Sequence, residues 1–163
     1  MKIAFINYNQ SPGYYSPEEW IRKIRPYFAV LEQLAHNHEV HYFSSLPHSY
    51  ECYFHKVYCH FKSSSNRLFS FIRLNSLIQK TAPELVVVYG LHFPFAVYLL
   101  RKLVGKKTKI ILQYHADKPF TGWRKYFQQH AAFGAGLDLA DGEGAGHHAG
   151  LVLELGHRHR LHV

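Results

Sequence analysis

One β-rich run of the chain ends in residues that could carry chemistry. Residues 109–114 are largely apolar, and His115 and Asp117 follow them at once. Open α/β sheets bind their ligands at the carboxyl ends of their strands. There His115 could donate a hydrogen bond to a hydroxyl or to a developing oxyanion, and Asp117 could orient that imidazole or close the following turn. We therefore expect a functional site at this strand end.

Two further loops could line the same cleft. Gly90 and His92 follow the apolar run at 85–89, although Gly90 could instead serve only to supply an unusual backbone angle. Gly13 and Tyr14 lie in the polar loop after the first predicted strand. Tyr14 could stack on a bound acceptor, but aromatic residues are common throughout this chain. We expect these loops to lie beside the end of the 109–114 strand.

Hydrophobic patterning predicts the elements that would position these residues. Strands are expected at 2–8, 39–44, 52–62, 85–89 and 109–114. Helices are expected at 17–36, with a possible kink at Pro26, and at 66–80, 94–104 and 122–132. The runs at 85–89 and 109–114 lack strict alternation, which is typical of strands buried on both faces of a parallel sheet. The order of elements predicts a single-domain, doubly wound, mostly parallel α/β sheet of Rossmann-like type.

Composition and charge limit the class of protein. Of 163 residues, 47% are hydrophobic and 18% are charged, which excludes a disordered chain. The length accommodates one domain with a core and is too short for two full α/β domains. Lysine and arginine together number 19 against 11 acids, for a net charge of +8. This excess favours an anionic partner such as a phosphate, a nucleotide, a nucleic acid or an acidic membrane.

The cysteines and the hydropathy bear on location. If 52–62 is one strand, the odd separation of Cys52 and Cys59 places them on opposite faces, so no disulfide between them is expected. The chain begins with a predicted strand instead of a signal peptide, and no apolar run approaches the length of about 18 residues typical of a membrane span. We expect a cytoplasmic protein, with contact at the inner face of the membrane left open.

The composition changes abruptly after residue 132. Residues 133–163 contain seven of the 11 glycines and five of the 14 histidines, without a single lysine, serine or tyrosine. The histidines there show no spacing that defines a metal site. We expect two regions: a Rossmann-like domain at 1–132, and at 133–163 an aberrant tail, frame-shifted or foreign in origin, that is not part of the native fold.

Four stretches of residues 1–132 resemble the amino-terminal, acceptor-side domain of GT-B glycosyltransferases, in particular the family 4 group. The first is the opening strand and its loop with Pro-Gly at 12–13, where the family carries a Gly-Gly pair. LAHNHEV at 34–40 is similar to the family's "L…GHEV" link, and PELVVVYGLH at 83–92 is similar to its "PDVVHVHG" strand and turn. YHAD at 114–117 resembles the strand end that carries a histidine beside the reacting sugar.

This resemblance implies transfer of a sugar from a nucleotide-sugar donor to a carbohydrate or lipid-linked acceptor. It implies no cofactor and no metal. The donor nucleotide would be held by a C-terminal domain that this chain lacks, so the chain alone would be inactive. Basic and aromatic residues could touch an anionic membrane, and no specific nucleic acid is expected. The resemblance assigns His115 to catalysis and five residues to substrate binding: Gly13, Tyr14, Gly90, His92 and Asp117.

Two other classes of function remain open from the sequence. The first is a stand-alone flavodoxin-like binding or regulatory domain. A receiver domain would need acids where Asn7, Asn9 and Gln10 stand, and the loop at 9–16 lacks the G-x-G-x-x-G of a dinucleotide site. The second is a basic nucleic-acid-binding domain, which would lose affinity steeply as salt rises.

Overall fold

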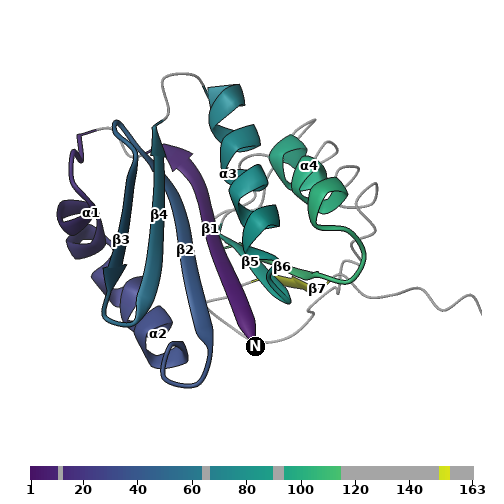
Figure 1. Ribbon diagram of the computed structural model, residues 1–163, viewed down its shortest axis with the longest axis horizontal. Helices are drawn as coiled ribbons and strands as arrows, with labels where there is room; N and C mark the ends of the chain where they lie inside the picture. The colour runs from purple at the N-terminus through teal and green to yellow at the C-terminus, as the bar shows by residue number, and fades with distance from the viewer. Residues whose placement is uncertain (11–12, 64–66, 90–93, 115–150, 155–163) are drawn as a thin grey trace, which may run out of the picture.

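The protein is a mostly parallel sheet with helices on both faces (Figure 1). The computed structural model describes residues 1–10, 13–63, 67–89, 94–114 and 151–154. The strands are β1 (Lys2–Gln10), β2 (Glu39–Leu46), β3 (Tyr50–Phe54), β4 (Val57–Ser63), β5 (Leu85–Tyr89), β6 (Lys109–Tyr114) and β7 (Leu151–Glu154). The helices are α1 (Pro17–Lys23), α2 (Arg25–Leu34), α3 (Arg67–Thr81) and α4 (Pro94–Val104). The predicted doubly wound, Rossmann-like α/β class is confirmed.

The order of the strands places a topological switch point between β1 and β5. In space the strands follow the order β3-β4-β2-β1-β5-β6-β7. The five strands from β4 to β6 are parallel, and β3 and β7 are antiparallel to their neighbours. The chain builds outwards from β1 in one direction and then crosses to β5 and continues in the other. Ligands of doubly wound sheets bind at this switch point, outside the carboxyl ends of the two central strands.

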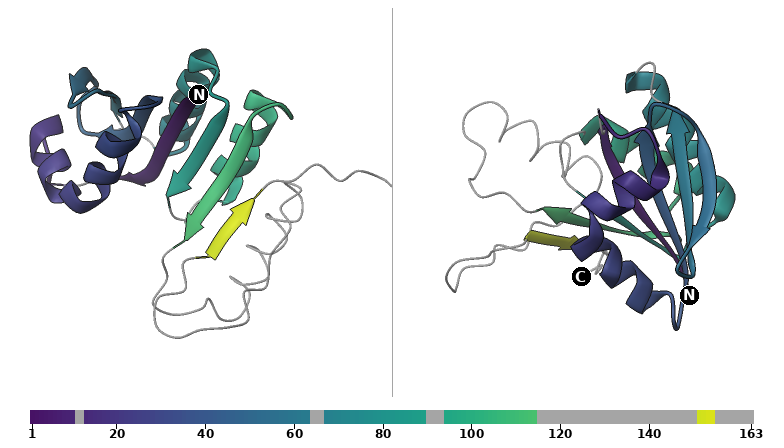
Figure 2. Two further views of the ribbon diagram at one scale, coloured as in Figure 1. Left: turned by 90° about the horizontal axis from the view of Figure 1, so that it is seen from below. Right: turned by 90° about the vertical axis from the view of Figure 1, so that its left-hand side faces the viewer.

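Two hydrophobic cores lie on the opposite faces of the sheet. Figure 2 shows α1 and α2 on one side and α3 and α4 on the other. Along β1, Ile3 and Phe5 belong to the core under α1 and α2, whereas Ala4 and Ile6 belong to the core under α3 and α4. All four side chains are buried. Burial of both faces explains why the central strands are apolar without alternation.

The predicted helix at 17–36 is two helices. Ser16 caps α1 by accepting a hydrogen bond from the backbone N–H of Glu19 at 3.2 Å. The helical dihedral angles end at Ile24, whose φ of −98° and ψ of 21° separate α1 from α2. Pro26 explains the break, because its nitrogen has no hydrogen to donate to the preceding turn and its ring crowds that turn's carbonyl. The proline therefore interrupts the helix, which is a larger effect than the predicted kink.

The predicted single strand at 52–62 is wrong, because this segment forms most of a β-hairpin. His55 and Lys56 form a two-residue turn with φ values of 47° and 69°. Positive φ at both positions is the conformation of the type I′ turns that join hairpin strands. The usual Asn-Gly or Asp-Gly signal is absent from His-Lys, so the turn escaped prediction. In the hairpin Cys52 lies directly opposite Cys59, so they share a face instead of lying on opposite faces.

Strand β7 comes from the segment with the unusual composition. It pairs antiparallel with β6, from Ile111 opposite Glu154 to Tyr114 opposite Leu151. The rest of 133–163 and the predicted helix at 122–132 lie outside the described residues. The assignment of 133–163 to an aberrant tail stays a prediction.

Candidate functional site

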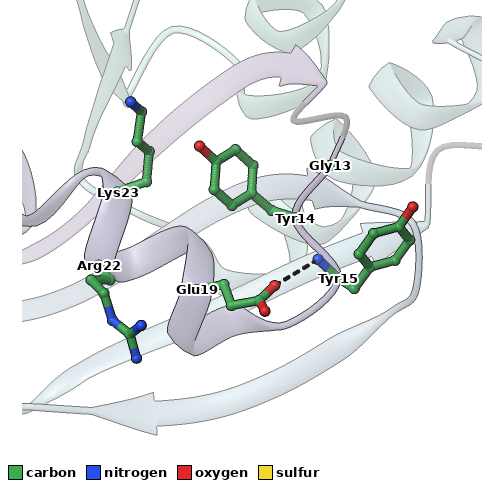
Figure 3. Close-up of a pocket in the computed structure, with 6 residues that line it drawn as sticks. All are labelled: Gly13, Tyr14, Tyr15, Glu19, Arg22 and Lys23. Carbon is green, nitrogen blue, oxygen red and sulfur yellow. Dashed lines mark hydrogen bonds between the residues drawn. The ribbon is translucent and has the colours of Figure 1, made fainter.

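A pocket of about 430 Å³ lies where the loop after β1 meets α1 (Figure 3). Its described lining residues are Gly13, Tyr14, Tyr15, Glu19, Arg22 and Lys23. The loop leaves β1 at the carboxyl edge of the sheet, on one side of the switch point between β1 and β5. The loop thus begins at the edge of the sheet where this class of fold binds ligands, and its Tyr15 is hydrogen-bonded to Tyr50 of the outer strand β3.

Gly13 shapes the entry to the pocket through its backbone. Its φ of +90° lies in a region that residues with a Cβ rarely adopt. A Cβ built on Gly13 would meet no atom within 4 Å. The backbone angle, and not a lack of space, is therefore what requires glycine here.

Tyr14 connects the pocket to the core of the domain. Its ring packs edge-on against Trp20, with 5.3 Å between the ring centroids. The indole Nε1 of Trp20 donates a hydrogen bond to the buried hydroxyl of Tyr42 on β2, at 2.9 Å. Burial is the main reason that the pKa of Tyr42 is raised to about 12, so this hydroxyl stays protonated at neutral pH. The Tyr14 ring is thereby fixed at the pocket by Trp20, which is itself hydrogen-bonded to Tyr42 of the central sheet.

The backbone of Tyr15 is fixed while its ring is exposed. Its N–H donates to the Glu19 carboxylate at 3.2 Å, and its carbonyl accepts a hydrogen bond from the Tyr50 hydroxyl at 3.0 Å. The side chain itself is 64% exposed. An exposed ring on a fixed backbone can contact a ligand while the protein loses little conformational entropy.

The pocket carries more positive than negative charge. Arg22 and Lys23 are exposed, and no ion pair between described residues involves either of them. Glu19, the single acid among the described lining residues, is engaged with Tyr15. In Figure 3 the two basic side chains point to opposite sides of α1, with the Tyr14 ring on the side of Lys23. The arrangement can bind an anionic group next to an aromatic ring.

Two of the predicted site residues meet in this pocket, and four fall elsewhere in the chain. Gly13 and Tyr14 line it together. The other four lie outside the described residues: Gly90, His92, His115 and Asp117. The strands that precede them are neighbours, since Tyr89 at the end of β5 is opposite Gln113 of β6. The predicted roles of these four residues stay predictions.

Three charged lining residues were not predicted as parts of a site. Their residue types fit equally well a helix cap, for Glu19, and a solvated basic helix face, for Arg22 and Lys23. Arg22 and Lys23 are three and four residues after Glu19, so each lies next to Glu19 on α1. This spacing, together with Tyr14 and Tyr15 just before the N-cap, is the sequence pattern that could have indicated a pocket here.

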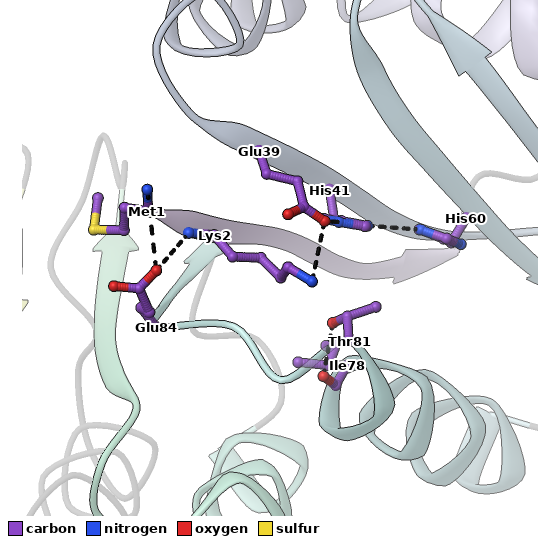
Figure 4. A network of polar contacts seen from close by, with 8 residues as sticks. All are labelled: Met1, Lys2, Glu39, His41, His60, Ile78, Thr81 and Glu84. Carbon is purple, nitrogen blue, oxygen red and sulfur yellow. Dashed lines mark hydrogen bonds and ion pairs between the residues drawn. The ribbon is translucent and has the colours of Figure 1, made fainter.

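A second polar cluster begins at the amino ends of β1 and β2, away from the pocket (Figure 4). Glu39 accepts hydrogen bonds from Lys2 Nζ at 3.0 Å and from His41 Nε2 at 2.9 Å. His41 Nδ1 is 3.0 Å from Nε2 of His60. Because Glu39 occupies one nitrogen of His41, the other is left to accept from His60. This chain of hydrogen bonds joins β1, β2 and β4.

The titration of this cluster follows from burial and from its contacts. Burial and the neighbouring His41 lower the pKa of His60 to about 4, so His60 is neutral at physiological pH. The hydrogen bonds from His41 and Lys2 lower the pKa of Glu39. Within the described ranges no three His, Cys, Asp or Glu side chains are grouped so that they could hold a metal ion. We interpret the cluster as structural.

Comparison of the chain with protein-family models, with curated proteins and with solved structures found no significant match in any of the three. Among the described residues, no helix has both the length and the apolar composition needed to cross a bilayer. The fold and the pocket are therefore the features of the molecule that bear on its function.

Proposed function

We propose that this chain is the amino-terminal, acceptor-side half of a glycosyltransferase. It would act in the transfer of a sugar from a nucleotide-sugar to a carbohydrate or lipid-linked acceptor. The observation that carries the proposal is the pocket formed by the loop after β1 and by α1, where Tyr14 and Tyr15 lie next to Arg22 and Lys23. The loop follows the carboxyl end of a central strand, and loops of this kind bind ligands in doubly wound sheets.

The side chains of the pocket suit a sugar that carries a negative charge. A tyrosine presents an apolar ring, against which the C–H face of a sugar can pack, and a hydroxyl that can hydrogen-bond to it. Arg22 and Lys23 are free of ion pairs among the described residues, so an anion would not have to displace an internal partner. A phosphate or carboxylate on the acceptor would interact favourably with either cation.

In this proposal the other predicted residues complete the site from neighbouring loops. His115, after β6, would lie closest to the reacting sugar, and Asp117, Gly90 and His92 would contact substrate. A second domain would hold the nucleotide of the donor, with no cofactor or metal required. Contact with an anionic membrane through basic surface residues would suit a lipid-linked acceptor.

Ligand-observed NMR on the full chain tests the proposal. The probes are methyl glucoside, glucose 1-phosphate and uridine diphosphate. We expect both sugars to receive saturation from the protein, the phosphorylated sugar more strongly, and the nucleotide to bind weakly because in this proposal a second domain holds it. Tyr14→Ala should weaken the binding of glucose 1-phosphate by about tenfold, the factor that corresponds to one aromatic contact. The matched control is Tyr98→Ala, which removes a surface tyrosine of α4.

Two results would contradict the proposal. One is binding of the sugars that is equally strong in wild type and in Tyr14→Ala, since the pocket would then not be the site. The other is efficient nucleotide-sugar turnover by this chain alone, because the proposed half-site has no donor domain. Binding of DNA or RNA that weakens steeply with salt would favour the nucleic-acid alternative instead.

A further inference from the structure

The two cysteines of the chain face each other across the β3–β4 hairpin. Cys52 and Cys59 are register partners in the antiparallel ladder, and both are free thiols. Opposed residues in antiparallel strands have Cα atoms about 4.5–5.5 Å apart. A disulfide requires a Cα separation of about 4.4–6.8 Å. The backbone is therefore already placed for a bond between the two sulfurs.

The two-residue turn is what brings the thiols together. In such a hairpin the residues of each opposed pair are separated by an odd number and lie on one face, as Phe54 and Val57 also do. The register therefore places the Cys52 and Cys59 side chains on the same face of the hairpin, directly opposite each other. The odd spacing that would exclude a disulfide within one strand is the spacing that permits one here.

The two thiols differ in their access to solvent. Cys59 is fully buried, and Cys52 is partly exposed at the margin of the same core. A reagent in solution can therefore reach Cys52 directly, whereas Cys59 is reached through Cys52. This difference sets an order for any reaction of the pair.

We propose that Cys52 and Cys59 are a reversible modification site, at which a small disulfide such as oxidised glutathione converts the thiol pair into an intramolecular disulfide. The thiolate of Cys52 attacks one sulfur of oxidised glutathione, breaks its S–S bond and releases one glutathione thiolate. Cys59 then attacks the Cys52 sulfur and displaces the second glutathione, whose thiolate takes up the Cys59 proton as it leaves. The two cysteines lose two electrons and two protons, and one glutathione disulfide becomes two glutathione thiols.

The modification site is connected to the pocket. Tyr50, two residues before Cys52 on β3, donates its hydroxyl hydrogen bond to the Tyr15 carbonyl. A covalent bond between β3 and β4 would restrict the strand that holds this loop. Burial raises the pKa of both thiols, so the reaction should accelerate as pH rises and more Cys52 becomes thiolate.

Mass spectrometry of the reduced, full chain after incubation with oxidised glutathione tests the proposal. Trypsin cleaves after Lys56, between the two cysteines, so a disulfide joins two peptides that otherwise separate. We expect the peptides covering 24–56 and 57–62 to remain linked, with loss of two hydrogen atoms, and to separate on addition of dithiothreitol. Linkage should form faster at pH 8.5 than at pH 7, because the fraction of Cys52 present as thiolate increases with pH.

Single substitutions test the order of the two steps. Cys59→Ala should accumulate a glutathione adduct on Cys52, and Cys52→Ala should leave Cys59 unmodified. Unmodified thiols in the wild type, a stable glutathione adduct without linked peptides, or a disulfide between two copies on a non-reducing gel would each overturn the proposal. The wild-type digestion decides the question even if the Cys59→Ala variant does not fold.

Discussion

Tyr50 donates a hydrogen bond from its side-chain hydroxyl to the main-chain carbonyl of Tyr15, across 3.0 Å and 35 positions of sequence. Tyr50 begins the outermost strand, β3, and Tyr15 lies in the loop that forms the pocket. The hairpin is thus attached to the pocket by a contact independent of the hydrophobic core. Any ligand of the pocket would meet a loop held from two sides, by Glu19 and by Tyr50.

Tyr50→Phe should loosen this loop without unfolding the domain. The hydrogen bond is exposed to solvent, so its loss should lower the free energy of unfolding by less than about 1 kcal/mol. We expect faster hydrogen exchange at the amide of Tyr15, measured by NMR. Tyr53→Phe is the control, because Tyr53 is on the same strand with an exposed ring. Equal exchange rates in the two variants would show that the Tyr50 contact does not hold the loop.

Gly13→Ala should be destabilising although there is space for the methyl group. The φ of +90° imposes a conformational cost of about 1–2 kcal/mol on a residue with a Cβ. Urea unfolding measures this cost. Gly13→Asn should cost less than Gly13→Ala, because asparagine tolerates positive φ better than alanine does. Equal stability of Gly13→Ala and wild type would mean that the loop relaxes to another conformation.

The sequence predicted the central part of the fold because its signals are local. LVVVY at 85–89 is apolar at every position, and this pattern allows only a strand buried on both faces or a short buried helix. Ser16 and Pro17 are residue types favoured at the start of a helix, and in the structure Ser16 is the N-cap of α1. The hairpin was not predicted because its turn requires positive φ at His55 and Lys56. Histidine and lysine are not residue types that indicate such a turn.

The candidate site was only partly predictable because it depends on tertiary packing. Gly13 and Tyr14 could be placed by the rule that ligands bind at strand ends. The connection from Tyr14 through Trp20 to Tyr42 could not be predicted, since it joins residues of a loop, a helix and a strand. The fixed backbone of Tyr15 likewise depends on Tyr50, which lies far along the chain.

Tyr8→Phe should destabilise the core under α3 and α4. The Tyr8 hydroxyl donates to Asn75 Oδ1 at 2.6 Å, and Asn75 Nδ2 donates to the carbonyl of Ala96 at 2.9 Å. Removal of the hydroxyl leaves a buried amide oxygen without a donor, which costs about 1–3 kcal/mol. Tyr58→Phe is the matched control, because Tyr58 is 43% exposed. Equal losses in urea unfolding would contradict this role for Asn75.

The stability of the domain should fall as pH drops from about 6.5 towards 4, because of His60. In the unfolded chain a histidine binds its proton below about 6.5, whereas in the fold burial and His41 lower the pKa of His60 to about 4. The unfolded state therefore gains a proton first, and the stability present above pH 6.5 is lost on acidification, by about 1–2 kcal/mol after allowance for solvent screening. Urea unfolding at pH 7, 5.5 and 4.5 measures the loss.

His60→Gln keeps a donor for His41 Nδ1 but cannot titrate, so its stability should change less between pH 7 and 4.5. An identical pH dependence in wild type and His60→Gln would show that groups other than His60 cause the loss.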